Sequence, residues 1–268
     1  MAFTKAYAAQ CAALNIAPAT GYVIYEGPSL LDGSPIVVIA VIGSGNTKTG
    51  DMVQTYILRR DTSPLDALFS GADESICGDC KSRPALGGDC YVRVEQGPTV
   101  VFKALQSGNY PTTAPHNVRQ LTKGRGKRLG TYGDPMAVPA RVWEDLVYEY
   151  VPNGTVVGKD KHTGYTHQWL NPDISDAQRA RIMALCMASV DTVTEYEMAR
   201  HLGYRTFRVR TDSQPLLPGE FVCPASKEAG KKRLCNNCFA CDGIDGNDQK
   251  ANPVIIAHGS KVTWMSRA

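Results

Sequence analysis

Short hydrophobic runs alternate with amphipathic segments along most of the chain from residue 52 onward. The hydrophobic runs predict strands at 52–58, 90–94, 129–132, 165–169, 186–190, 204–209 and 253–257. The amphipathic segments predict helices at 63–69, 99–106, 139–150, 173–184 and 193–202. Repeated strand–helix units are typical of α/β proteins with a parallel sheet. The spacing of the units favours a partial (β/α) barrel, and a doubly wound open sheet is the alternative.

Two further regions flank these units, so the sequence predicts three parts: 1–45, 46–212 and 213–268. The first part has a helix pattern at 4–14 and two strand patterns, 21–25 and 35–42, that predict a flanking hairpin. The last part is a cysteine-rich extension that ends in the final strand. Its stretch 215–252 has many Gly, Asn and Lys residues, four cysteines and little hydrophobic periodicity. Such a segment buries too little apolar surface to fold stably by itself, so we expect a bound metal to stabilise it.

Composition adds little to this picture. The chain has 268 residues, 43% of them hydrophobic and 21% charged, with a formal net charge of +3. This weak basic balance does not by itself indicate a nucleic-acid partner. No hydrophobic run approaches the roughly 18 to 20 residues of a membrane span, and residues 1–16 lack the apolar core of a signal peptide. We therefore expect a cytoplasmic protein without a membrane partner.

The nine cysteines change the picture, because clustered thiols in a reducing compartment are more often metal ligands than disulfides. Four of them form the pattern C-x11-C-x2-C-x2-C near the C-terminus: Cys223, Cys235, Cys238 and Cys241. A C-x2-C-x2-C run with a distant fourth cysteine holds [4Fe–4S] clusters in ferredoxin-type proteins. Zinc sites more often use two separated pairs, and zinc is the alternative here.

A second group, Cys77, Cys80 and Cys90, has the spacing C-x2-C-x9-C. Three thiolates on a cluster leave one iron open to substrate or another ligand, and three on zinc leave a catalytic position. The seven clustered cysteines can form one shared centre or two separate centres, and their spacing does not decide between these. Cys11 and Cys186 stand alone, so we expect them to act as small buried hydrophobic residues.

Polar residues follow several of the predicted strands, at the edge where the working face of a barrel lies. Asp134, His167 and Asp191 are the candidate catalytic residues of this edge. Gln168, Ser189 and Arg208 are further polar candidates there. Gathered together, these side chains would line a pocket.

The densest basic run is Lys123, Arg125, Lys127 and Arg128, which is set among glycines. We expect a mobile loop exposed to solvent. Contact with the phosphates of a nucleic acid or cofactor is the alternative, although no aromatic residues are interleaved with the charges.

Several motifs occur in an order that resembles the Gene 88 protein family of actinobacterial phages, over residues 46–259. They are CGDC at 77–80, CYV at 90–92, YGDP at 132–135, GYTHQW at 164–169, MASVD at 187–191 and CPAS at 223–226. This resemblance implies a phage origin, hence the cytoplasm of a host cell, and a cysteine-rich metal protein, but no defined activity.

The arrangement also distantly resembles radical-SAM enzymes. Those combine a partial βα barrel with a three-cysteine cluster after an early strand, and many carry a second cluster in a C-terminal extension. This resemblance implies S-adenosylmethionine as a cofactor. The chain departs from the C-x3-C-x2-C pattern of that superfamily at Cys77, Cys80 and Cys90.

Three functions are consistent with these patterns. The first is an iron–sulfur enzyme whose open cluster binds substrate or S-adenosylmethionine near His167 and Asp191. The second is a non-enzymatic iron–sulfur module that carries electrons, senses redox state or regulates a host partner. The third is a zinc-stapled protein that binds nucleic acid through residues 123–128. Polar residues at several strand ends favour the first function, and the weak basic balance counts against the third.

Overall fold

The computed structural model describes residues 3–43, 49–230, 233–244 and 252–257. The helices are α1 (Lys5–Ala13), α2 (Pro64–Ser70), α3 (Glu74–Cys77), α4 (Gly97–Gln106), α5 (Pro115–Leu121), α6 (Ala140–Val147), α7 (Asp176–Met183), α8 (Val193–His201) and α9 (Cys235–Cys238), with short 3-10 helices η1 (Pro84–Leu86), η2 (Pro135–Ala137) and η3 (Gln168–Leu170). The strands are β1 (Gly21–Pro28), β2 (Pro35–Val41), β3 (Val53–Arg59), β4 (Lys127–Tyr132), β5 (Tyr148–Tyr150), β6 (Val156–Lys159), β7 (His162–Thr166), β8 (Met187–Val190), β9 (Thr206–Arg210), β10 (Glu220–Val222) and β11 (Asn252–Ile256).

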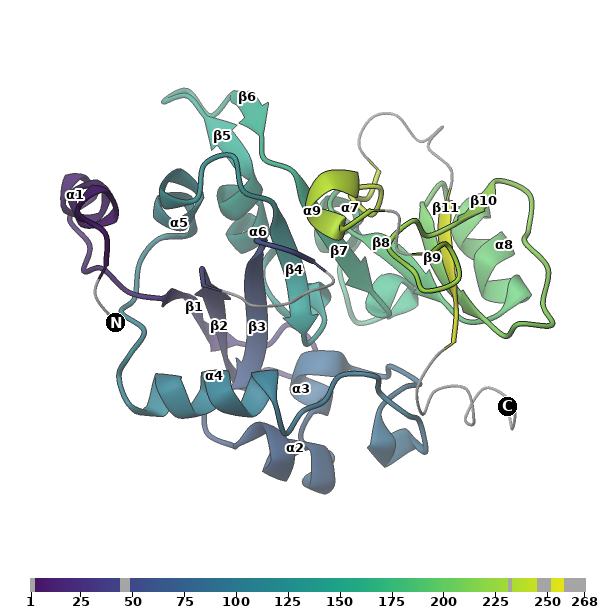
Figure 1. Cartoon of the computed structure of the whole chain (residues 1–268). Helices are drawn as coiled ribbons and strands as arrows, with labels where there is room; N and C mark the ends of the chain where they lie inside the picture. Colours follow the sequence, from purple (N-terminus) through teal and green to yellow (C-terminus); the bar gives the residue numbers. More distant parts are fainter. Residues whose placement is uncertain (1–2, 44–48, 231–232, 245–251, 258–268) are drawn as a thin grey trace.

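One large sheet organises the molecule, with the strand order β1-β2-β3-β4-β7-β8-β9-β11-β10 (Figure 1). Every neighbouring pair from β3 to β10 is parallel, which confirms the predicted α/β class. From β3 to β9 the strands lie in chain order, whereas the order of a doubly wound sheet reverses partway. This part of the sheet therefore winds in one direction. The closure of a partial barrel and the metal-stapled extension stay predictions.

The N-terminal hairpin belongs to this same sheet. β1 pairs antiparallel with β2, and β2 pairs antiparallel with β3, so the hairpin extends the parallel part by two strands. Strands β10 and β11 of the C-terminal part join its other end. The predicted hairpin is confirmed, and it is continuous with the strands that follow it.

Helices α6 and α7 cover one face of the sheet, whereas α4, in the crossover from β3 to β4, lies in front of the strands in Figure 1. Right-handed crossovers that wind in one direction place successive helices on the same side. Leu129 of β4 shares a hydrophobic core with Trp143 of α6 and Ile182 of α7, and Figure 1 shows both helices behind the strands. Because side chains alternate along a strand, Arg128 and Gly130 of β4 face the opposite side. That side carries the cavity described below.

Helix starts follow local sequence signals. The side chain of Thr4 accepts a hydrogen bond from the backbone N–H of Tyr7 at the start of α1. At the start of α8, Thr192 and Glu195 form a reciprocal capping box. These contacts satisfy N–H groups that the helix itself leaves without acceptors, so the predicted starts of α1 and α8 are confirmed to within a residue.

Three predicted elements differ from the structure. Residues 90–94 form turns and not a strand, because they cover the cavity and have no neighbouring strand to pair with. The helix predicted at 139–150 ends at Val147, and residues 148–150 form β5, which pairs with β6 in a separate hairpin. The basic run at 123–128 is a solvent-exposed loop only in part, as detailed below. No helix in the described part of the chain is long and apolar enough to cross a membrane.

Candidate functional site

A cavity of ≈ 330 Å³ lies on the sheet face opposite α6 and α7. Its wall consists of alternate residues from neighbouring strands: Arg128, Gly130 and Tyr132 of β4, Thr163 and Tyr165 of β7, Ser189 of β8, Phe207 and Val209 of β9, and Ile255 of β11. Both groups of cysteines contribute to the lining, through Cys77, Cys80, Cys90, Cys223 and Cys235. Residues more than a hundred positions apart in the sequence therefore meet around one space.

The first cysteine group lies at the carboxyl ends of the parallel strands. Cys77 ends α3, whose residue Ile76 accepts a backbone hydrogen bond from Asp134 N, just beyond β4. The Gln168 side chain, just beyond β7, donates to the carbonyl of Cys77 at 3.0 Å and to Asp79 at 2.7 Å. Gly78 has φ +59°, and a Cβ there would lie 2.3 Å from Gln168 Oε1. Glycine thus allows the close approach that fixes this loop to the sheet.

The three thiols of this group are electrostatic neighbours. Burial raises the pKa of Cys77 well above its ordinary value, and the Cys80 and Cys90 thiols raise it further. Like charges at short range oppose one another's ionisation, so the three thiols cannot all ionise in a buried site without a compensating positive charge. A bound metal ion is one group that would supply such a charge.

Cys80 has a basic partner in His167. Burial opposes ionisation of the Cys80 thiol, but the His167 imidazole lowers its pKa below the ordinary value. Burial likewise lowers the pKa of His167, but the Cys80 thiol outweighs burial and raises this pKa to about 9. Each group therefore favours the charged form of the other, a thiolate beside an imidazolium.

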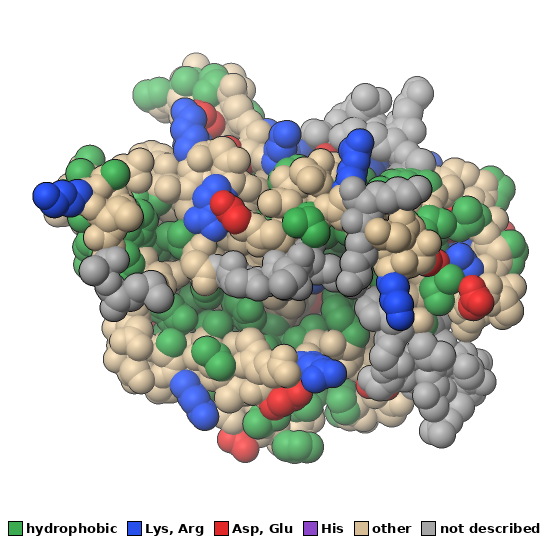
Figure 2. Space-filling view, viewed as in Figure 1, with side chains coloured by type: hydrophobic (Ala, Val, Ile, Leu, Met, Phe, Trp, Pro, Cys, Tyr) green, Lys and Arg blue, Asp and Glu red, His purple; other side chains and the backbone are tan. Residues whose placement is uncertain are grey.

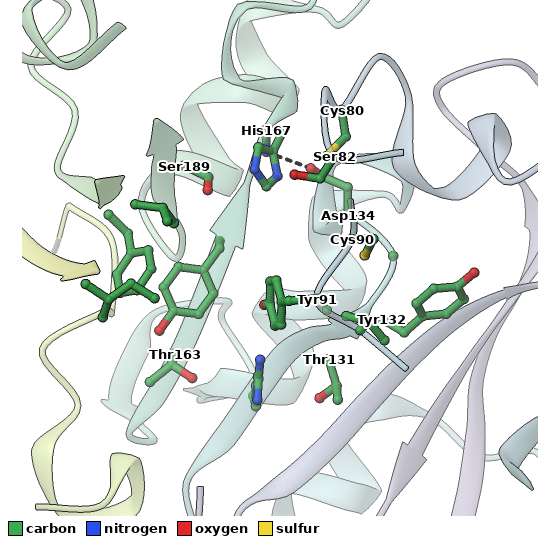
Figure 3. Close-up of a pocket in the computed structure, with 18 of the residues that line it drawn as sticks. Cys80, Ser82, Cys90, Tyr91, Thr131, Tyr132, Asp134, Thr163, His167 and Ser189 are labelled. Carbon is green, nitrogen blue, oxygen red and sulfur yellow. Dashed lines mark hydrogen bonds between the residues drawn. The ribbon is translucent and has the colours of Figure 1, made fainter. Parts of the chain in front are cut away.

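The candidate catalytic residues lie around this pair (Figure 3). The Asp134 carboxylate accepts hydrogen bonds from the backbone N–H of His167 at 2.8 Å and of Met136 at 2.9 Å. Burial raises the pKa of Asp134, and these hydrogen bonds act against the rise. Asp191 is close enough to raise the pKa of His167, but it is not one of the residues that line the cavity. The structure thus places Asp134 and His167 at the cavity and Asp191 beside it.

The other polar candidates have separate roles. Ser189 lines the cavity, and Gln168 anchors the first cysteine loop. Arg208 is fully engaged elsewhere, because its guanidinium forms an ion pair with the buried Glu220 at 2.6 Å. Arg208 is therefore a structural residue and not a candidate for the site.

In the second cysteine group, Cys235 and Cys238 of α9 lie toward the other end of the strands, whereas Cys223 directly follows the carboxyl end of β10. The Phe239 ring, directly after α9, lies 5.5 Å from Lys161 Nζ, just before β7, and Gly126 lies against the same ring just before β4. Burial raises the pKa of Cys241; a hydrogen bond with Tyr165 lowers it, and the thiols of Cys223, Cys235 and Cys238 raise it again. These four thiols therefore form a second set of neighbours, and Figure 1 shows α9 at the opposite end of the strands from α3.

Arg205, directly before β9, fixes the end of this second loop to the sheet. Its side chain is fully buried and donates hydrogen bonds to Asp242 at 2.6 Å, to the Gly243 carbonyl at 2.7 Å and to the Ala240 carbonyl at 2.6 Å. The backbone N–H of Gly164 donates to the Cys241 carbonyl at 3.0 Å. Hydrogen bonds from β7 and from the residue before β9 therefore position Cys241, and the loop does not depend on hydrophobic burial alone.

The donor atoms of both groups suit iron–sulfur clusters. All seven are thiol sulfurs, the ligands that hold such clusters. Within the described residues, no three His, Cys, Asp or Glu side chains converge as they do around a single metal ion.

The basic run does not form a surface patch. Lys127 has no exposed side-chain surface and forms an ion pair with Asp160 at 2.6 Å. Arg125 is bound to Asp51 at 3.0 Å, and Arg128 points into the cavity. The expectation of a solvent-exposed loop is confirmed for Lys123 and Gly124, and it is wrong for Lys127 and Arg128, which belong to β4. On the face shown in Figure 2, Lys and Arg side chains are scattered singly.

A scan against models of protein families found no match to this chain, and searches of curated proteins and of solved structures found none either.

Proposed function

We propose that this protein is an iron–sulfur enzyme that holds two clusters beside one internal cavity. Cys77, Cys80 and Cys90 would hold the first, and Cys223, Cys235, Cys238 and Cys241 would hold the second. One observation carries the proposal: two separate sets of neighbouring thiols border the same cavity. Cys80 and Cys90 act on the pKa of Cys77, and Cys223, Cys235 and Cys238 act on that of Cys241, which favours two centres over one shared centre.

The first group supports an enzyme and not only an electron carrier. With three thiolates, a cluster there keeps one iron available for substrate or for a molecule such as S-adenosylmethionine. Beside it, the chain's own residues line a mostly enclosed space: His167 can hold a proton at Nε2, which is buried without a hydrogen-bond partner among the described residues. Asp134 fixes the backbone of His167, and the apolar residues of β9 and β11 exclude water.

The fold is consistent with this proposal. A sheet that winds in one direction, with a cavity on the face opposite α6 and α7, supports the predicted partial barrel. The phage origin and the use of S-adenosylmethionine rest on motif resemblance alone. A zinc-stapled nucleic-acid binder is disfavoured, because Lys127 and Arg128 face the interior.

Purification without oxygen, followed by a visible spectrum and by iron, sulfide and zinc analysis, tests the proposal. We expect a brown protein with iron and sulfide in near-equal amounts. Cys80→Ala and Cys238→Ala should each remove a separate part of the iron, and Cys186→Ala is the matched control that should retain all of it. A colourless protein that contains only zinc would refute the proposal.

A further inference from the structure

Arg128 occupies the middle of the cavity wall. In β4 it pairs in register with Gln54 of β3 and with Thr163 of β7, and both Arg128 and Thr163 line the cavity. Cysteines of both groups line the same space. Any molecule that enters the cavity therefore meets this guanidinium.

Arg128 differs from other arginines inside the molecule. Arg83, Arg205 and Arg208 each form an ion pair with a carboxylate, at 2.8, 2.6 and 2.6 Å. By contrast, Arg128 forms no ion pair with a carboxylate among the described residues, and its Nε, like that of Arg205, is buried without a hydrogen-bond partner there. A buried cation without an anion is costly, so such a group is retained where a ligand supplies the missing charge.

The groups nearest to Arg128 are weak acids and not carboxylates. Burial lowers the pKa of its guanidinium, but Tyr91, Tyr165, Cys235 and Tyr56 raise it by their proximity. Tyrosine is uncharged near neutral pH, so these phenols leave the positive charge of Arg128 uncompensated. Cys235 belongs to the proposed second cluster and gives Arg128 a thiolate neighbour only on that side.

The remaining wall is largely apolar. The rings of Tyr165 and Phe207 pack edge to face with centroids 4.8 Å apart, and Val92, Val209 and Ile255 complete the lining. In Figure 3, Tyr91 lies between the Cys80–His167 end and the Thr163 end of the cavity. A volume of ≈ 330 Å³ is in the range of sites for small organic ligands.

We propose that Arg128 binds the carboxylate or phosphate of a small organic anion whose apolar body lies against the aromatic wall of the cavity. The planar guanidinium suits the paired oxygens of both groups, and the adjacent Thr163 hydroxyl offers a further hydrogen bond. This inference deepens the proposed function, since it names the substrate class of the same cavity. It places the reacting part of the ligand toward Cys80 and His167.

Calorimetric titration of the full chain, purified without oxygen, tests this inference. The probes are benzoate and phenyl phosphate, with benzyl alcohol as the neutral aromatic of similar size. We expect one or both anions to bind more tightly than benzyl alcohol, and Arg128→Gln to weaken that binding by about 10- to 100-fold. Arg128→Lys should retain part of the affinity. The matched control Arg141→Gln, on exposed α6 surface, should leave it unchanged.

Three outcomes would overturn the inference: no anion binding at millimolar concentration, equal affinity for benzyl alcohol, or full anion affinity in Arg128→Gln with its folding verified by circular dichroism. If Arg128→Gln kept full anion affinity but lost iron, the role of Arg128 would instead be to balance the charge of the second cluster. Iron and sulfide analysis of the same samples separates the two proposals. If the protein contained no iron but still bound the anions through Arg128, the proposed clusters would be refuted and the proposed anion site would be supported.

Discussion

Arg205→Ala should release the second cysteine loop from the sheet. The substitution removes a fully buried guanidinium from Asp242, whose side chain is 12% exposed, and from two backbone carbonyls. Removing one partner of a buried ion pair costs about 3 to 5 kcal/mol, and the slight exposure of Asp242 favours the lower end of this range. We therefore expect the free energy of unfolding to fall by about 3 kcal/mol.

Equilibrium unfolding in urea measures this loss, and metal analysis measures its functional consequence. Because Ala240 to Gly243 flank Cys241, the variant should also lose the iron assigned to the second group and retain that of the first. Arg141→Ala is the matched control, since its ion pair with Asp145 is largely exposed and should contribute no more than about 1 kcal/mol.

Two results would refute this reasoning. The first is a loss of less than about 1 kcal/mol in Arg205→Ala, which would show that water or other groups replace the guanidinium. The second is full metal content in a destabilised variant, which would separate the Arg205 contacts from the geometry of the thiols. The double variant Arg205→Met with Asp242→Asn removes both charges, so it should be less destabilised than Arg205→Ala.

Three further predictions follow from the same structure. Gly78→Ala forces a side chain into a positive-φ position against Gln168, so it should cost about 1 to 3 kcal/mol and lower the iron of the first group; thermal unfolding showing no change would contradict the steric argument. Burial lowers the pKa of His162 to about 4, so the neutral ring contributes stability that is present above about pH 6.5 and lost as pH falls toward 4; a pH series in urea should show this loss, and His162→Gln should flatten it. Cys11→Ala and Cys186→Ala should retain full metal and lose at most about 1 to 2 kcal/mol, and iron loss in either would show that these buried thiols are ligands.

Elements with strong local signals could be predicted from the sequence. The helix α8 begins at a Thr192–Glu195 capping box, and α2 begins after Ser63 with Pro64 in its first turn. Both signals act over three or four residues, so the sequence alone determines them. The alternation of strands and helices likewise predicts a parallel sheet, because only crossover connections can join parallel neighbours.

Long-range contacts explain what the sequence did not reveal. The run from Lys123 to Arg128 has the composition of a surface loop, yet Asp160 and the cavity draw Lys127 and Arg128 inward. Residues 90–94 have the composition of a strand but no partner to pair with. The cysteine spacing predicted two local groups, whereas their common cavity depends on the packing of β4, β7 and β11.

The importance of Arg128 was missed for the same reason. Within the sequence it is one of four basic residues in a short run, and nothing local distinguishes it from its neighbours. Its position in the register of β4 directs it to the cavity face, while Lys127 is directed to the helix face. Because side chains alternate along a strand, Lys127 has a structural role, whereas Arg128 is a candidate ligand-binding residue. The sequence pattern could have separated these two roles only if the strand had been predicted to begin at Lys127.

The insertion of β11 between β9 and β10 has a consequence for biosynthesis. Strand β10 precedes β11 in the chain, yet it reaches the sheet only through β11, and Cys223 N donates to the Val254 carbonyl. While the ribosome is still making the chain before residue 252, β10 has no neighbour to join, and Cys223 has no fixed position. Cys77, Cys80 and Cys90 precede most of the parallel strands and can be placed earlier. If the proposed clusters are present, the first site would therefore be formed before the second.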